Sequence, residues 1–263
     1  MRKLHKRLAA GNEKGFTLIE MAIVLVIIGI IIGSIMKGRD VIKGSQIKEF
    51  ANAYVGKWQT MVNQYYDKTG QNLADTSRNG GTIAFADNLD GYMDGAATDL
   101  LAADADRVRV IAAMRRVGID PCQIVKSKLF DAAPGAAPAT QCADSKNVGQ
   151  TKVDGEFSAN QTVTVGFTNL RLTLAGIVQK KNVLYFTGMP LDVAIAIDKI
   201  YDGADSGEGG SIVNLGCAND AANTGAAIAQ TANAAANVAS APARWAVATN
   251  VNTLCTLGMI LEH

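Results

Sequence analysis

A run of 21 residues from Phe16 to Met36 constrains this chain more than any other feature, because Glu20 is its only charged residue. As an α-helix rising about 1.5 Å per residue, the run extends about 31 Å, the thickness of a bilayer's hydrocarbon core. Five basic residues and one acidic residue precede it. By the positive-inside rule, this distribution predicts a cytoplasmic N-terminus and an exported segment after residue 36.

The remainder of the chain is mildly acidic. Residues 1–15 hold five of the 25 Lys and Arg side chains and one of the 24 Asp and Glu side chains, so residues 16–263 carry a net charge near −3. A net negative charge does not indicate a basic surface that would bind nucleic acid. The 263 residues suffice for one span and one or two modest globular units.

Glu20 is the residue of this run whose transfer into a bilayer costs the most free energy. A charged side chain at the centre of a bilayer costs about 2.5–3.5 kcal/mol for the more expensive types, so a partner or a function is expected for it. The alternative is a carboxylate that reaches the membrane edge, because Glu20 lies near the start of the run.

The heptapeptide KGFTLIE, residues 14–20, resembles the cleavage and methylation site of type IV prepilins and type II secretion pseudopilins. In that family, a short basic leader ends in Gly and is followed by Phe, Thr-Leu-Ile-Glu and an apolar helix. The resemblance implies that a prepilin peptidase cuts between Gly15 and Phe16 and methylates the new amine of Phe16. It covers residues 1 to about 45 strongly and the rest loosely.

Cleavage would give Glu20 a partner. The free amine of Phe16, with an ordinary pKa near 7.7–8.0, is largely cationic at neutral pH. We expect Glu20 of one subunit to neutralise Phe16 of a neighbour in a filament core. Removing one member of such a buried pair typically costs about 3–5 kcal/mol.

The predicted architecture is α+β and pilin-like, with a long N-terminal helix packed on a C-terminal antiparallel sheet. It comprises a cytoplasmic leader (1–15), a transmembrane or filament-core helix (16–36), an amphipathic continuation (37–70) and an extracytoplasmic globular domain (71–263). The continuation is expected to end near Gly70, a good residue for the position after a helix. Apolar residues that recur at helical spacing predict a buried core face: Ile42, Ile47, Phe50, Tyr54, Trp58, Met61 and Tyr65.

Within the globular domain, residues 71–98 read as loop. A second helix is predicted from Asp99, its N-cap, to Gly118 and Pro121. Three antiparallel strands are predicted at 162–167, 172–178 and 183–187. Residues 189–203 fit either a strand or a short helix after Pro190, and their resemblance to the stretch that follows the sheet in prepilin-type proteins favours the helix.

The C-terminal part holds less readable sequence. Residues 218–243 are of low complexity, rich in Ala, Asn and Thr, and their conformation is not predicted. We expect residues 245–249 and 254–261 to return to the sheet.

All four cysteines lie in the exported part, where an oxidising compartment favours disulfides. Four cysteines allow three pairings, and the sequential one is favoured because it closes two separate loops. Free buried thiols are the alternative, and zinc is disfavoured because there is no C-x-x-C spacing. The predicted pairs are Cys122 with Cys142 and Cys217 with Cys255.

Metal binding elsewhere has weak support. Four acidic residues lie on or near a Gly-rich turn, and some pseudopilins of the resembled family hold calcium in a C-terminal loop. Their spacing does not fit an EF-hand, so a solvated turn is favoured and no metal or cofactor is expected. The weak calcium candidates are Asp198, Asp202, Asp205 and Glu208.

The predicted function is that of a structural subunit of a type IV pilus or a type II secretion pseudopilus, with a minor pilin favoured. The expected partners are prepilin peptidase, other pilin subunits, an inner-membrane assembly platform and, before assembly, the membrane itself. The precursor is expected in the inner membrane and the mature subunit in a periplasmic or surface filament.

Two other classes of protein fit the sequence less well. One is a membrane-anchored periplasmic binding protein that does not polymerise. The other is an enzyme, which is not expected because His263 is the only histidine after the leader, so a Ser-His or Cys-His pair lacks a base. The chain also carries no GxxxxGK[ST] site that could drive filament extension.

Overall fold

The computed structural model describes residues 16–80, 91–93, 104–124, 149–203, 206–217, 241–245 and 253–262. The chain divides into two units, residues 1–45 and 46–263. The boundary falls inside α1 (Leu18–Phe50), which is followed by the π-helical turn η1 (Ala51–Val55) and by α2 (Gly56–Thr69). Gly70 ends this helical stretch with a positive φ of 66°, as predicted for the position after a helix.

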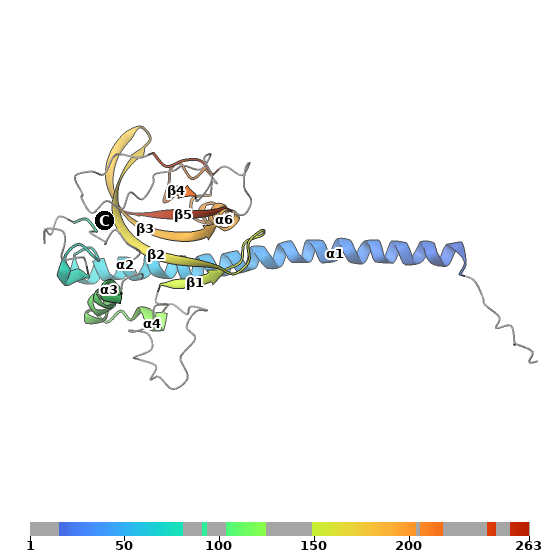
Figure 1. The fold of residues 1–263 in the computed structure, drawn as a ribbon, viewed down its shortest axis with the longest axis horizontal. Helices are drawn as coiled ribbons and strands as arrows, with labels where there is room; N and C mark the ends of the chain where they lie inside the picture. The colour runs from blue at the N-terminus through green and yellow to red at the C-terminus, as the bar shows by residue number, and fades with distance from the viewer. Residues whose placement is uncertain are drawn as a thin grey trace, which may run out of the picture. The chain divides into compact units, whose positions relative to one another are not determined.

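The second unit is built on a five-stranded antiparallel sheet with the order β1-β2-β3-β5-β4. This confirms the predicted α+β architecture, a long N-terminal helix followed by an antiparallel sheet. Figure 1 shows α2 lying along one face of this sheet. The strands are β1 (Gln150–Val153), β2 (Gln161–Leu174), β3 (Ile177–Pro190), β4 (Ile212–Cys217) and β5 (Leu254–Leu261).

Aromatic side chains join the helix to the sheet. The rings of Trp58 and Phe167 meet edge to face with centroids 6.0 Å apart, and the rings of Tyr54 and Phe186 lie 5.9 Å apart. Such pairs contribute about 0.5–1.5 kcal/mol beyond the area they bury. The predicted core role of this helix face is thereby confirmed for its buried members, Tyr54, Trp58, Met61 and Tyr65, whereas Ile42 is exposed.

The prediction of three short strands between residues 162 and 187 was wrong, because the chain forms one long hairpin of two 14-residue strands there. The turn falls inside residues 172–178, which the sequence predicts as one of the three strands. Ala175 and Gly176 both have positive φ, 50° and 80°, as the central residues of a type I′ turn require.

Three short helical segments lie between α2 and β1 in the described residues: η2, a 3-10 turn (Ser77–Asn79), α3 (Asp104–Arg116) and α4 (Pro121–Ile124). The predicted N-cap Asp99 lies outside the described residues. As expected, Gly118, with φ of 78°, and Pro121 follow the end of α3 at Arg116. Pro121 also opens α4, where its lack of an N–H costs nothing. Lys57 and Lys68 extend from α2 and donate to the carbonyls of Ile124 and Val117, at 3.0 and 2.9 Å.

Helix α6 (Leu191–Asp202) follows β3 directly, after Pro190. This confirms the helical interpretation of residues 189–203 over the strand. Gly203, with φ of 72°, closes it. β5 returns to the sheet between β3 and β4, as expected for residues 254–261, whereas residues 246–249 lie outside the described part of the chain.

Candidate functional site

The N-terminus of α1 is closed by a reciprocal set of hydrogen bonds between Thr17 and Glu20. The backbone N–H and the hydroxyl of Thr17 donate to Oε2 of Glu20 at 2.8 and 2.9 Å. The backbone N–H of Glu20 donates back to the Thr17 hydroxyl at 3.3 Å. This is a capping box, in which residues three apart each satisfy the other's backbone donor at a helix start.

The capping box gives Glu20 a role that the sequence interpretation missed. The signal was present, because Thr17-Leu-Ile-Glu20 is a T-x-x-E pattern immediately before an apolar run. Phe16 and Glu20 are both exposed in the single chain, whereas Gly15 lies outside the described residues. Pairing of Glu20 with the amine of another subunit therefore stays a prediction, as do cleavage and methylation.

The first half of α1, residues 21–36, is apolar around its whole circumference. Large hydrophobic side chains are exposed at consecutive positions from Ile30 to Ile32 and from Ile23 to Ile28, so no single face is reserved for water. A helix that is hydrophobic on all sides is stable only when it is surrounded by lipid or by other apolar helices. Within the described residues, one helical stretch, Leu18–Thr69, is long and apolar enough to cross a membrane.

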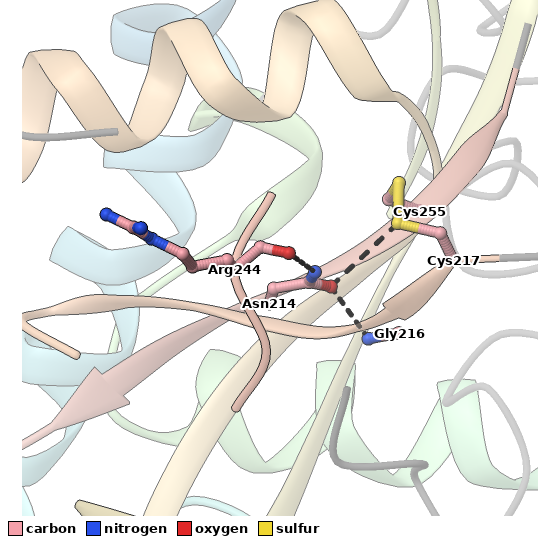
Figure 2. Close-up of a disulfide and its surroundings, with 5 residues drawn as sticks. All are labelled: Asn214, Gly216, Cys217, Arg244 and Cys255. Carbon is pink, nitrogen blue, oxygen red and sulfur yellow. Dashed lines mark hydrogen bonds between the residues drawn. A yellow bond between two sulfur atoms is a disulfide. The ribbon is translucent and has the colours of Figure 1, made fainter. Parts of the chain in front are cut away.

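A disulfide joins β4 to β5 between Cys217 and Cys255, whose Cα atoms are 3.9 Å apart (Figure 2). These two residues form one of the two pairs in the sequential arrangement. Asn214 lies beside the bond: its Oδ1 accepts from the backbone N–H of Gly216 at 2.8 Å, and its Nδ2 donates to the carbonyl of Arg244 at 3.5 Å.

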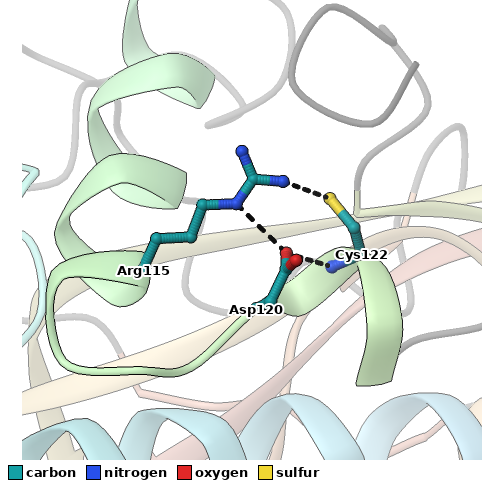
Figure 3. Close-up of polar contacts among 3 residues, drawn as sticks. All are labelled: Arg115, Asp120 and Cys122. Atoms are coloured by element: carbon teal, nitrogen blue, oxygen red, sulfur yellow. Dashed lines mark hydrogen bonds and ion pairs between the residues drawn. The ribbon is translucent and has the colours of Figure 1, made fainter. Parts of the chain in front are cut away.

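Cys122 is also disulfide-bonded, but its predicted partner, Cys142, lies outside the described residues. Figure 3 shows how the start of α4 holds Cys122. The carboxylate of Asp120 accepts the backbone N–H of Cys122 at 3.2 Å and pairs with Nε of Arg115 at the same distance. Asp120 thereby serves as an N-cap and fixes the end of α3 against α4.

Two acidic residues of α6, Asp198 and Asp202, accept hydrogen bonds from backbone N–H groups and, for Asp198, also from an indole N–H. Asp198 is 1% exposed, and its Oδ2 accepts from the N–H of Gly207 at 2.9 Å and from Nε1 of Trp245 at 2.8 Å. Asp202 accepts from the N–H groups of Ser211 and Ile212, at 3.0 and 2.8 Å.

Each of these two carboxylates already accepts two hydrogen bonds from the protein. Burial raises the pKa of Asp198 to about 6. Glu208 lies 3.8 Å from Arg244 in an exposed ion pair, and Asp205 lies outside the described residues. Among the residues that the structure describes, no three or more acidic, Cys or His side chains gather in a metal-binding group.

Comparison with protein families matches residues 11–36 to the prokaryotic N-terminal methylation motif, the prepilin signature of type IV pilins and pseudopilins. This match supports a type IV pilin-like or pseudopilin precursor and suggests a structural rather than a catalytic protein. The apolar helix is consistent with a single-pass inner-membrane precursor of this type. Comparisons with curated proteins and with solved structures find no match to the chain.

Proposed function

We propose that this protein is a structural subunit, favoured to be a minor pilin, of a type IV pilus or a type II secretion pseudopilus. The observation that carries the proposal is the prepilin motif on a helix that is capped by Thr17 and Glu20 and that is apolar on every side over residues 21–36. Such a helix has two stable surroundings, the bilayer before assembly and a bundle of like helices afterwards.

The proposed sequence of events begins with the leader, residues 1–15, in the cytoplasm. Prepilin peptidase removes it after Gly15 and methylates Phe16. The span, residues 16–36, then leaves the bilayer for the filament core, where the new amine of one subunit meets Glu20 of another. An inner-membrane assembly platform receives the subunit, and the helix continuation (37–70) carries the globular domain (71–263) on the outside.

The capping box leaves Glu20 able to act both in the free precursor and in the assembled filament. Its Oε2 already accepts two hydrogen bonds from Thr17. A carboxylate has about four acceptor sites, so Oε1 can take the amine of a neighbour while Oε2 still closes the helix. The same residue therefore suits the free precursor and the assembled filament.

The alternative is a membrane-anchored binding protein that does not polymerise. The second unit has a groove of about 190 Å³ between the helical stretch and β1, lined by residues that include Phe50, Tyr54 and Val153. Pockets for drug-sized ligands usually have volumes of about 300–1,000 Å³. The groove is small by that measure, so it does not favour the alternative.

The test is the intact mass of the protein extracted from membranes of cells that contain a prepilin peptidase. The proposal expects a chain that begins at a methylated Phe16 and sediments with sheared filaments. A chain that keeps its leader would overturn the proposal and favour the anchored binding protein. A processed chain that never enters filaments would reject the structural role alone.

A further inference from the structure

The two ends of β2 carry exposed surfaces of opposite chemistry. At one end is the hairpin tip, defined here as residues 171–181. At the other end is the β1–β2 loop, residues 154–160. Figure 1 shows them at opposite ends of the long hairpin. Because β2 has 14 residues and a strand rises about 3.3 Å per residue, the two surfaces are separated by roughly 40–45 Å along the strand.

The hairpin tip is basic and apolar. Ile177 and Val178 are 62% and 55% exposed. Arg171 and Lys180 are direct cross-strand partners, and Lys181 follows. Nζ of Lys180 lies 3.6 Å from the centroid of the Tyr92 ring, a cation–π contact, whereas Arg171 is exposed. Residues 161–190 contain no Asp or Glu. The tip therefore places the exposed base Arg171 near two exposed aliphatic side chains.

The β1–β2 loop has the complementary composition. Phe157 is 52% exposed, and Asp154 and Glu156 beside it are exposed as well. Asp192 lies next to the loop and accepts the backbone N–H of Glu156 at 2.6 Å. Lys152 on β1 is the nearby base in the sequence, so the acids outnumber it.

The loop has a defined conformation. The backbone N–H of Asn160 donates to the Asp154 carboxylate at 2.6 Å, and the N–H of Gly155 donates to the carbonyl of Ser158 at 2.7 Å. A loop closed by its own hydrogen bonds presents Phe157 at little further cost in conformational entropy when a partner binds.

We propose that the hairpin tip of one copy of this protein docks on the β1–β2 loop of a second copy. Ile177 and Val178 would cover Phe157, while the basic side chains of the tip face Asp154 and Glu156. We choose a second copy as the partner because one chain carries both surfaces, and the hairpin tip matches the β1–β2 loop in its apolar side chains and is opposite to it in charge. This inference rests on the proposed function.

The geometry of such a contact suits a filament. A contact between two different surfaces of the same chain is heterologous, and repeated copies of it form an open line unless the rotation closes a ring. Opposite charges at the rim of a contact favour correct register and disfavour wrong partners. The contact would therefore align the globular domains independently of the apolar helix.

The test uses charge reversal in the full-length chain, with the amount of subunit in sheared filaments as the measurement. We expect Arg171→Glu and Glu156→Lys each to lower that amount about tenfold, and the chain with both changes to recover it. Lys199→Glu is the matched control, because Lys199 is an exposed base on α6 that belongs to neither surface as defined above. Recovery in the double variant supports the contact, since a misfolded chain would not recover.

A second measurement does not depend on charge. Copies with Phe157→Cys and copies with Ile177→Cys are expressed together and treated with a short bismaleimide. We expect a cross-linked dimer in filaments and none between two copies of the same variant. Normal assembly of Arg171→Glu, or filaments without the cross-link, would overturn the contact and leave the proposed function standing. If the unaltered chain keeps its leader, the proposed function fails and the contact fails with it.

Discussion

The indole Nε1 of Trp245 donates a 2.8 Å hydrogen bond to Oδ2 of Asp198, across 47 residues of sequence. The bond ties α6 to the segment 241–245, and the N–H of Gly207 donates to the same oxygen. The other carboxylate oxygen of Asp198 is buried without a hydrogen-bond partner. Asp198 is therefore a buried acid whose ionised form is incompletely compensated.

The buried carboxylate of Asp198 predicts that its contribution to the free energy of unfolding changes with pH. Burial raises the pKa of Asp198 from 3.8 to about 6 against the opposing effect of its hydrogen bonds, and the charge of Asp202 raises it further. Since the folded pKa exceeds the unfolded one, the folded state alone holds this proton between about pH 4 and 6. The Asp198 contribution to the free energy of unfolding thus rises as the pH falls through 6, by up to about 3 kcal/mol.

The measurement is urea denaturation of the detergent-solubilised chain across this pH range, followed by tryptophan fluorescence. Asp198→Asn keeps an oxygen acceptor for Trp245 and removes the titration, so the difference between variant and parent should shrink as the pH falls. A difference that stays constant from about pH 7 to pH 5 would contradict the raised pKa.

The loop that receives Asp198 depends on glycine at position 207. Gly207 has a φ of 70°, and a Cβ there would lie 2.8 Å from Nε1 of Trp245. We expect Gly207→Ala to lower the free energy of unfolding by about 1–3 kcal/mol, because it combines a left-handed backbone with a steric clash. Gly209→Ala is the matched control, because a Cβ at position 209 would meet no atom within 4 Å and the φ of Gly209 is not in the left-handed region. Equal denaturation midpoints for the two variants would refute this account.

Two substitutions at the start of α1 separate capping from charge pairing. Thr17→Ala removes the cap, worth about 0.5–2 kcal/mol to a helix, and keeps the carboxylate. Glu20→Gln keeps a capping acceptor, since Gln also serves in a capping box, and removes the charge. If Glu20 neutralises the amine of a neighbour, Glu20→Gln should be depleted from mixed filaments relative to wild type, and Thr17→Ala much less so. Quantitative mass spectrometry of sheared filaments measures both, and the reverse order of depletion would assign Glu20 to capping alone.

The disulfide between β4 and β5 should contribute substantially to stability. Its cysteines are 38 residues apart, and in the chain-entropy model a loop of this length gives about 4 kcal/mol. The double variant Cys217→Ser, Cys255→Ser should show a lower urea midpoint than the oxidised parent. Both chains are measured oxidised, so that the disulfide of Cys122 is present in each, and an unchanged midpoint in the double variant would reject the expectation.

The parts of the fold that could be predicted from the sequence are those with a local physical signal. Gly70 and Gly203 end helices because glycine adopts positive φ without strain, and each follows a run of helical periodicity. The aromatic residues Tyr54 and Trp58 recur at helical spacing, so their burial followed from the sequence.

Other features have weak local signals. The hairpin turn uses Ala175 at positive φ, where Asn or Asp would have marked the turn, so the apolar run seemed continuous. The π-helical turn Ala51–Val55 has no composition of its own; Tyr201 from α6 donates to the carbonyl of Ala51 at 3.4 Å, a contact set by tertiary structure. The Thr17–Glu20 capping box was readable but was overlooked because Glu20 was considered only as a charge in an apolar environment.

The bond between Cys217 and Cys255 also has a consequence for how this chain tolerates change. It closes residues 217–255 into a covalent ring whose two ends are pinned 3.9 Å apart on adjacent strands. Insertions, deletions or a single protease cut inside the ring leave both attachment points in place and release no fragment while the bond is oxidised. The Ala- and Asn-rich sequence within the ring can therefore vary in length without any matching change in the sheet.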